Sequence, residues 1–148
     1  VIAYVTDNYL EQPMWLTISG SAIMLGVIVY GLKAFKLENE GYLSISESLK
    51  TGLAISLIAA IIVTLYNYIF TTFIEPDTIN QSIEIAREQM LTQNPNMTQE
   101  QMDMAMGITK MMFKPTIMAA MGIIVTLFFG FIVSLIAGLF MKENRPEH

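Results

Sequence analysis

The sequence contains no cysteine and a single histidine, His148, which is its last residue. The lack of cysteine excludes a disulfide framework, a thiolate metal site and a cysteine nucleophile. A histidine at a chain end is a poor catalytic base, because chain ends fray. No serine lies in a recognisable nucleophile motif, and no glycine-rich loop follows a strand pattern. The sequence therefore predicts a protein that is not an enzyme and binds no cofactor or metal.

Charged residues are also scarce, at 14% of the chain against about 25% in soluble domains. Residues 12–32, 51–74 and 115–141 contain none. A helix rises about 1.5 Å per residue and the hydrocarbon layer is about 30 Å thick, so roughly 20 residues are enough to cross it. We therefore expect membrane spans at about residues 14–35, 45–73 and 114–141, with the lipid bilayer as partner. The net charge of −5 argues against a nucleic acid partner.

Helix-start patterns and apolar periodicity define the segments around the second span. Ser44 and Glu47 have the spacing of a capping box, in which each side chain binds the backbone amide of the other, and this predicts a helix start there. Glu75-Pro76-Asp77 should end the span and begin a new helix, because proline and acidic residues suit a first helical turn. The new helix has one apolar face, formed by Ile79, Ile83, Ala86 and Met90.

Asn94-Pro95-Asn96 should end that helix, and Thr98 with Gln101 forms a second capping box that starts the next one. Residues 75–112 are therefore predicted to form a helical hairpin outside the membrane. The fold class that follows is all-α, an integral membrane helical bundle that forms a single domain over residues 1–148. The first residues, Val-Ile-Ala-Tyr-Val, look like the end of another apolar segment, so we expect that an earlier helix is missing.

Four segments of the sequence form a recognisable order. They are Gly41 to Gly52, Tyr68-Ile69-Phe70, Phe73-Ile74-Glu75-Pro76-Asp77 and Ile85-Ala86-Arg87-Glu88-Gln89-Met90. Together they resemble the bacterial domain-of-unknown-function family 4199. The helix that starts at Thr98-Gln99-Glu100-Gln101 follows them in the same order. The resemblance covers nearly the whole chain. It implies a small bacterial inner-membrane protein with four membrane helices when complete, and no assigned activity or site residues.

Basic residues near the span ends predict the orientation, because they favour the cytoplasmic side. Five lie on one side of the spans and three on the other: Lys33, Lys36, Lys50, Lys142 and Arg145 against Arg87, Lys110 and Lys114. The C-terminus and the loop at residues 36–47 are therefore expected to be cytoplasmic, and the hairpin at residues 75–112 extracytoplasmic.

Small residues recur every four positions along two spans. They are Gly52, Ser56, Ala60 and Thr64 in the second span, and Gly122, Thr126, Gly130, Ser134 and Gly138 in the third. In lipid, helices associate by close packing, and small side chains let backbones approach. The stripes are interpreted as a helix-packing interface between the second and third spans of one chain. The alternative is an interface in a homo-oligomer.

A methionine cluster offers a remote alternative function, because thioether sulfur selects copper(I). Met102 and Met106 share a helix face, but Met104 points about 200° away from Met102, so ordinary packing is the favoured interpretation. Two further hypotheses are open. One is a structural or accessory role in which the hairpin or the stripes bind another membrane protein or a second copy. The other is a subunit of an oligomeric transporter or channel.

Overall fold

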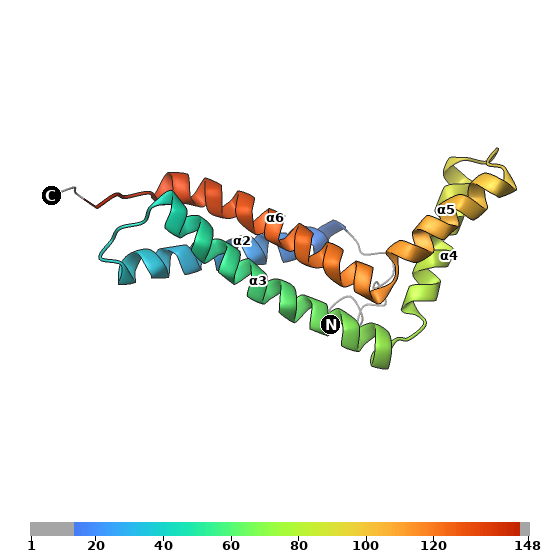
Figure 1. Cartoon of the computed structure of the whole chain (residues 1–148), viewed down its shortest axis with the longest axis horizontal. Coiled ribbons are helices and arrows are strands. Elements are labelled where there is room, and N and C mark those ends of the chain that lie inside the picture. Colours follow the sequence, from blue (N-terminus) through green and yellow to red (C-terminus); the bar gives the residue numbers. More distant parts are fainter. Residues whose placement is uncertain (1–13, 146–148) are drawn as a thin grey trace. The chain divides into compact units, whose positions relative to one another are not determined.

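The computed structural model describes residues 14–145, which form five α-helices and one π-helical turn (Figure 1). In chain order they are α2 (Met14–Glu38), α3 (Ile45–Ile69), η1 (Phe70–Ile74), α4 (Thr78–Gln93), α5 (Gln99–Met112) and α6 (Pro115–Met141). The all-α fold class is therefore confirmed. The apolar segment at residues 1–5 and His148, on which the sequence made predictions, lie outside the described residues.

Among the described residues, three helical segments are long and apolar enough to cross a membrane: Met14–Glu38, Ile45–Ile74 and Pro115–Met141. The first ends at Glu38 rather than near residue 35. Its end is set by Glu40 and Gly41, which adopt φ angles of 59° and 86°, and by a bond of 2.8 Å from the Gly41 amide to the Lys36 carbonyl. This left-handed turn with a six-to-one hydrogen bond is a common helix terminator.

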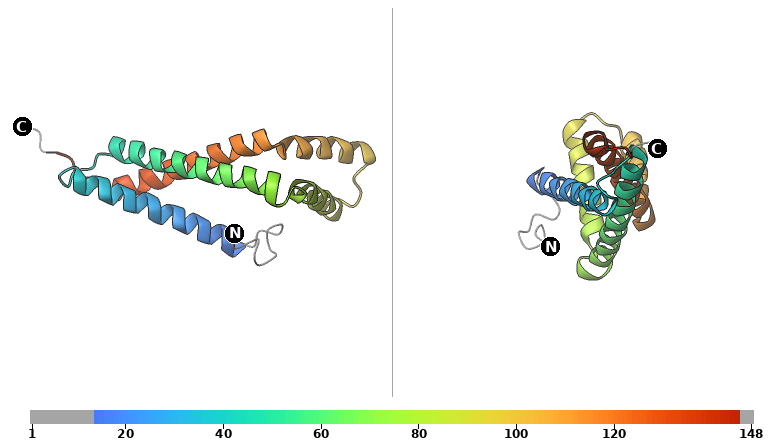
Figure 2. Two further views of the ribbon diagram at one scale, coloured as in Figure 1. Left: turned by 90° about the horizontal axis from the view of Figure 1, so that it is seen from below. Right: turned by 90° about the vertical axis from the view of Figure 1, so that its left-hand side faces the viewer.

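The described residues fall into two compact units, residues 14–63 with 123–145 and residues 64–122. In the first unit, α2 packs beside the adjoining parts of α3 and α6, and those parts of α3 and α6 cross (Figure 2). Its apolar core is formed by Ile28 and Leu32 of α2 with Val133 of α6. We call this part the span unit.

The second unit, residues 64–122, contains the predicted hairpin, and we call it the hairpin unit. Met102 and Thr109 of α5 are buried, and the predicted apolar face of α4 is half-buried throughout. The Thr98 capping box is confirmed, because the Thr98 hydroxyl accepts from the Gln101 amide at 3.3 Å and the Gln101 side chain accepts from the Thr98 amide at 3.0 Å. Helix α4 ends at Gln93, directly before the predicted break.

The junction between α3 and α4 differs from the prediction in two details. The last turn of the second candidate span is π-helical, with the Glu75 amide donating to the Phe70 carbonyl at 2.8 Å. Helix α4 begins at Thr78, so Pro76 precedes it instead of lying in its first turn. Pro76 still separates the two helices, because a proline disfavours helical dihedral angles at the residue before it, here Glu75. The helical segment that contains α3 and η1 therefore ends before Pro76, and α4 starts after it.

Candidate functional site

The small-residue stripes of α3 and α6 face each other within the span unit. Gly52 lies against Ser134, Ser56 against Gly130, and Ser48 against Gly138. Each contact pairs a glycine with a serine, and the glycine alternates between the two helices. We call these three pairs the glycine–serine interface.

The contacts leave no room for a side chain on the glycines. A Cβ atom on Gly130 would lie 2.5 Å from the Cβ of Ser56, one on Gly52 would lie 2.6 Å from the Cβ of Ser134, and one on Gly138 would lie 2.8 Å from the Cβ of Ser48. In ordinary contact, carbon atoms lie about 3.5 to 4.0 Å apart. The two backbones therefore approach as closely as glycine alone permits.

The serine hydroxyls of the interface are all hydrogen-bonded. Ser48 Oγ donates across the interface to the Ser134 carbonyl at 2.7 Å. Ser56 Oγ and Ser134 Oγ donate within their own helices, to the carbonyls of Gly52 at 2.7 Å and Gly130 at 2.5 Å. A buried hydroxyl without a partner is costly, so these bonds let three polar side chains lie inside an apolar bundle.

Other members of the predicted stripes take no part in the three pairs. Ala60 is buried, at 1% exposure, and Thr126 is half-buried. Gly122 is exposed, and an added Cβ would meet nothing within 4 Å. Ser48, which the stripes did not include, supplies the interhelical bond. It precedes Gly52 by one step of four residues, so extending the same periodicity backwards would have found it.

Helix α2 also enters this packing, which the sequence analysis did not predict. A Cβ on Gly31 would clash with the Ile55 side chain of α3, so α2 and α3 are close there. Ile28 and Leu32 flank that contact and are fully buried. Gly31 is not part of a series of small residues at four-residue spacing, so the sequence around it does not predict a helix contact.

A cluster of polar residues ties the helix ends of the span unit together, and we call it the polar cap. Lys36 of α2 donates to the Met141 carbonyl at 3.0 Å and forms an ion pair with Glu143 at 2.9 Å. Backbone bonds of 2.9 and 3.0 Å join Leu43 and Glu143 as an isolated antiparallel bridge. The loop before α3, at Leu43, is therefore hydrogen-bonded to the segment after α6, at Glu143.

Arg145 contributes further contacts to the polar cap. Its guanidinium donates to Asn39 Oδ1 at 3.0 Å, lies 3.7 Å from a Glu40 carboxylate oxygen, and stands 5.7 Å from the ring centre of Tyr42. A guanidinium over an aromatic face is a favourable cation–π arrangement.

Glu47 completes the polar cap and confirms the first capping box. Glu47 accepts from the Ser44 amide and hydroxyl, both at 2.8 Å, and the Glu47 amide donates to Ser44 Oγ at 3.2 Å. Asn39 donates to the same carboxylate at 3.4 Å. These hydrogen bonds fix the start of α3 against the loop that precedes it.

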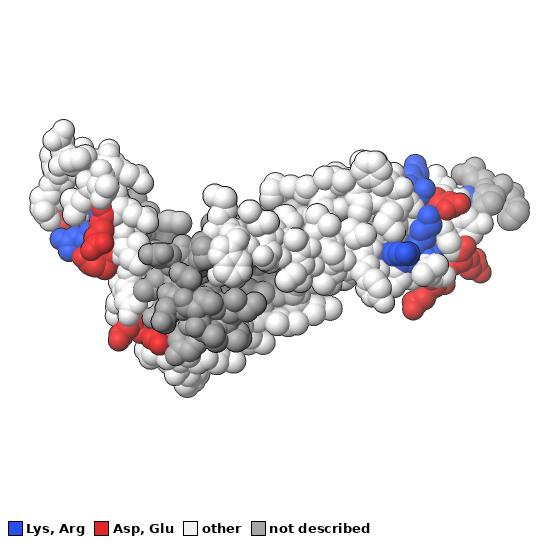
Figure 3. All heavy atoms as spheres, turned by 180° about the vertical axis from the view of Figure 1, so that it is seen from behind, with Lys and Arg blue, Asp and Glu red and all other residues white. Residues whose placement is uncertain are grey.

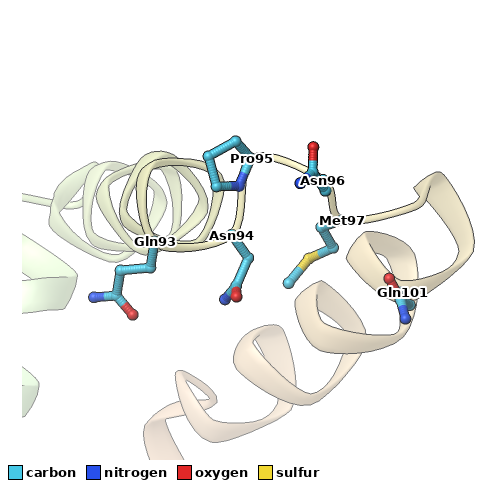
Figure 4. Close-up of a pocket in the computed structure, with 6 residues that line it drawn as sticks. All are labelled: Gln93, Asn94, Pro95, Asn96, Met97 and Gln101. Carbon is cyan, nitrogen blue, oxygen red and sulfur yellow. The ribbon is translucent and has the colours of Figure 1, made fainter.

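The methionines of α5 do not converge on one point. Met102 is buried at 5% exposure, whereas Met104 is 66% exposed. Among residues 14–145, no group of three or more His, Cys, Asp and Glu side chains is placed to hold a metal. The tip of the hairpin has a shallow hollow between the ends of α4 and α5, into which Asn94 and Met97 project (Figure 4). Its other lining residues are Gln93, Pro95, Asn96 and Gln101.

Comparison with models of known protein families identifies a family for this chain. The family model described as "Protein of unknown function (DUF4199)" matches residues 1–143. Neither the curated proteins nor the solved structures gave a significant match.

Proposed function

Since the chain belongs to the DUF4199 family of proteins of unknown function, we propose that it is a non-enzymatic, multi-span protein of the bacterial inner membrane with a structural or accessory role. In this proposal the span unit is a self-contained anchor, and the hairpin unit contacts a partner membrane protein. The observation that carries it is the contrast between the covered glycine–serine interface inside the span unit and the exposed apolar face of α5 in the hairpin unit.

The interior of the span unit supports the anchor role. All three glycine–serine pairs join helices of one chain, so these small residues are already covered and are not available to a second copy. In lipid, such backbone contacts are a main source of helix association. A self-contained bundle needs no partner to satisfy them.

The outer face of α5 supports the contact role. Met104, Ile108 and Met111 lie on the side of α5 opposite the buried Met102 and Thr109, and they are 66%, 54% and 53% exposed. Exposed apolar side chains at such spacing along one helix face are typical anchors for a partner. Methionine suits this use because its flexible thioether adapts to irregular surfaces.

We propose that the hairpin is extracytoplasmic and that the C-terminus and the loop at residues 36–47 are cytoplasmic. The support is the excess of basic residues at the polar-cap end of the spans. The partner would then be met on the outer side of the inner membrane.

Site-specific photocrosslinking in growing cells tests the contact role. A photoreactive phenylalanine analogue replaces Ile108, and in a control it replaces Glu88, an exposed residue of α4. We expect a discrete adduct from position 108, and a weaker one or none from position 88. Equal labelling from both positions, or an adduct only at 88, would reject the outer face of α5 as the contact surface.

The mass of the adduct separates the alternatives. A product of about twice the chain mass, together with an oligomer in mild detergent, would favour an oligomeric transporter or channel subunit, because a pore requires several copies of so small a bundle. An adduct with a different protein, from a chain that is monomeric in detergent, would favour the accessory role.

A further inference from the structure

Basic side chains of the span unit divide into two groups according to their partners. Lys36 and Arg145 are held in the polar cap by Glu143, Glu40 and Asn39. Lys33, Lys50 and Lys142 are exposed, and none has an ion-pair or hydrogen-bond partner among the described residues. Three cations from three different parts of the fold are thus left unneutralised at one end of the unit.

The distance of each lysine from the end of its helix decides whether its ammonium group can reach the headgroup layer. Lys33 lies about 7.5 Å before the end of α2 at Glu38, and Lys50 lies about 7.5 Å inside the start of α3 at Ile45, at about 1.5 Å per residue. Lys142 directly follows α6. Lysine stems lie along apolar surface and carry the ammonium toward the polar boundary, so all three ammonium groups can reach the headgroup layer.

The acidic residues at this end leave the three lysines unpaired. Glu143 and Glu40 are paired with Lys36 and Arg145, and Glu47 is bound by Ser44 and Asn39. Glu38, at the last position of α2, is exposed and has no partner among the described residues. On the face seen in Figure 3, Lys and Arg side chains form a band across this end of the unit, with acidic side chains beside it.

We propose that Lys33, Lys50 and Lys142 form a binding surface for the headgroups of anionic phospholipids. The unpaired ammonium groups are opposite in charge to the lipid phosphate. They also lie at the end of the apolar spans, where a phosphate is found when the acyl chains of its lipid lie along those spans. Basic residues near an anionic membrane surface each contribute to binding. An acidic protein would meet these lysines only through the headgroup layer, so lipid is the favoured partner.

Thermal unfolding in detergent, followed by helical circular dichroism, tests this proposal with two lipids. We expect added phosphatidylglycerol to raise the melting temperature more than the same amount of phosphatidylcholine, and we expect the difference to shrink as salt rises. Replacing the three lysines by glutamine should remove the difference, with phosphatidylglycerol affinity falling about fivefold per lysine.

A matched control removes three basic charges from the hairpin unit by the changes Arg87→Gln, Lys110→Gln and Lys114→Gln. This variant should keep most of the phosphatidylglycerol effect. Equal stabilisation of the unaltered chain by both lipids would overturn the proposal, as would a triple-lysine variant that still prefers phosphatidylglycerol. Inorganic phosphate that stabilises as well as the lipid would also overturn it.

If the triple variant does not fold, the three single variants replace it, and phosphatidylglycerol adducts are counted by native mass spectrometry. Each single variant should hold fewer adducts than the unaltered chain. Unchanged adduct numbers in all three would reject the lysine surface.

Discussion

Replacing Gly130 by alanine tests the glycine–serine interface with the smallest possible change. The new methyl group would lie 2.5 Å from Ser56 Cβ, about 1 Å closer than ordinary carbon contact allows. The crowding must be relieved by moving α3 and α6 apart or by displacing Ser56, whose hydroxyl is bonded to the Gly52 carbonyl. Overpacking of this kind costs about 1 to 3 kcal/mol.

Gly122 offers a control on the same helix, because an added Cβ there meets nothing within 4 Å. Alanine is favoured over glycine in a helix interior by about 1 kcal/mol, and this gain applies to both positions. The two variants should therefore differ by about 1 to 3 kcal/mol in unfolding free energy. For a chain of this size the melting temperatures should differ by about 2 to 12 °C.

Thermal unfolding in detergent, with oligomer size recorded by light scattering, measures this difference. A Ser56→Gly change should recover part of the loss in the Gly130→Ala background, because it removes the atoms that the new methyl group meets. If the Gly130→Ala and Gly122→Ala variants have the same melting temperature, the close approach of the two helices is refuted. It is also refuted if Ser56→Gly does not raise the melting temperature of the Gly130→Ala variant.

Three further predictions use simpler readouts. Ser48→Ala removes the hydrogen bond to the Ser134 carbonyl and should lower the unfolding free energy by about 0.6 kcal/mol, and at most about 1.7, as measured in detergent; no loss would show that this bond contributes nothing. Because the sequence has no cysteine, single cysteines can be introduced at Asn94 and at Glu38 and treated with a membrane-impermeant maleimide on intact cells. Glu38 is chosen instead of Asn39 because the Asn39 side chain is hydrogen-bonded. The cysteine at position 94 should react and the one at position 38 should be protected, and the reverse pattern would invert the orientation. Replacing Met102, Met104 and Met106 by leucine should leave metal content and helicity unchanged, and bound copper that disappears in this variant would contradict packing as their role.

The elements that could be predicted from the sequence depend on local rules. The apolar runs, the Thr98 and Ser44 capping boxes and the break at Pro95 each follow from residues within a few positions of one another. They correspond to three candidate spans and a helical hairpin among residues 14–145. The π-helical end of α3 was beyond such rules, because Phe70–Ile74 carries no residue type that demands it.

The interface could be located only in part. Four-residue spacing places Gly122 and Gly130 on one face of α6, but it does not say how far along that face α3 remains in contact. Crossing helices separate away from their closest point, so only a few positions of a stripe can be in tight contact. The polar cap was missed because Arg145 contacts Asn39 and Tyr42 from a distant segment of the chain, which the Leu43–Glu143 bridge joins to their loop.

Disulfide trapping within the membrane tests most directly whether the glycine–serine interface joins helices of one chain. Cysteines replace Ser48 and Gly138, whose Cβ atoms would lie 2.8 Å apart, against about 3.5 to 4.5 Å in a disulfide, so a small outward shift is enough. After mild oxidation and unfolding in sodium dodecyl sulfate, which exposes these buried positions, we expect a chain of unchanged mass whose two thiols resist maleimide until they are reduced, while each single-cysteine variant reacts without reduction. A disulfide-linked product of twice the chain mass, with no protected monomer, would place the interface between chains and contradict the self-contained anchor.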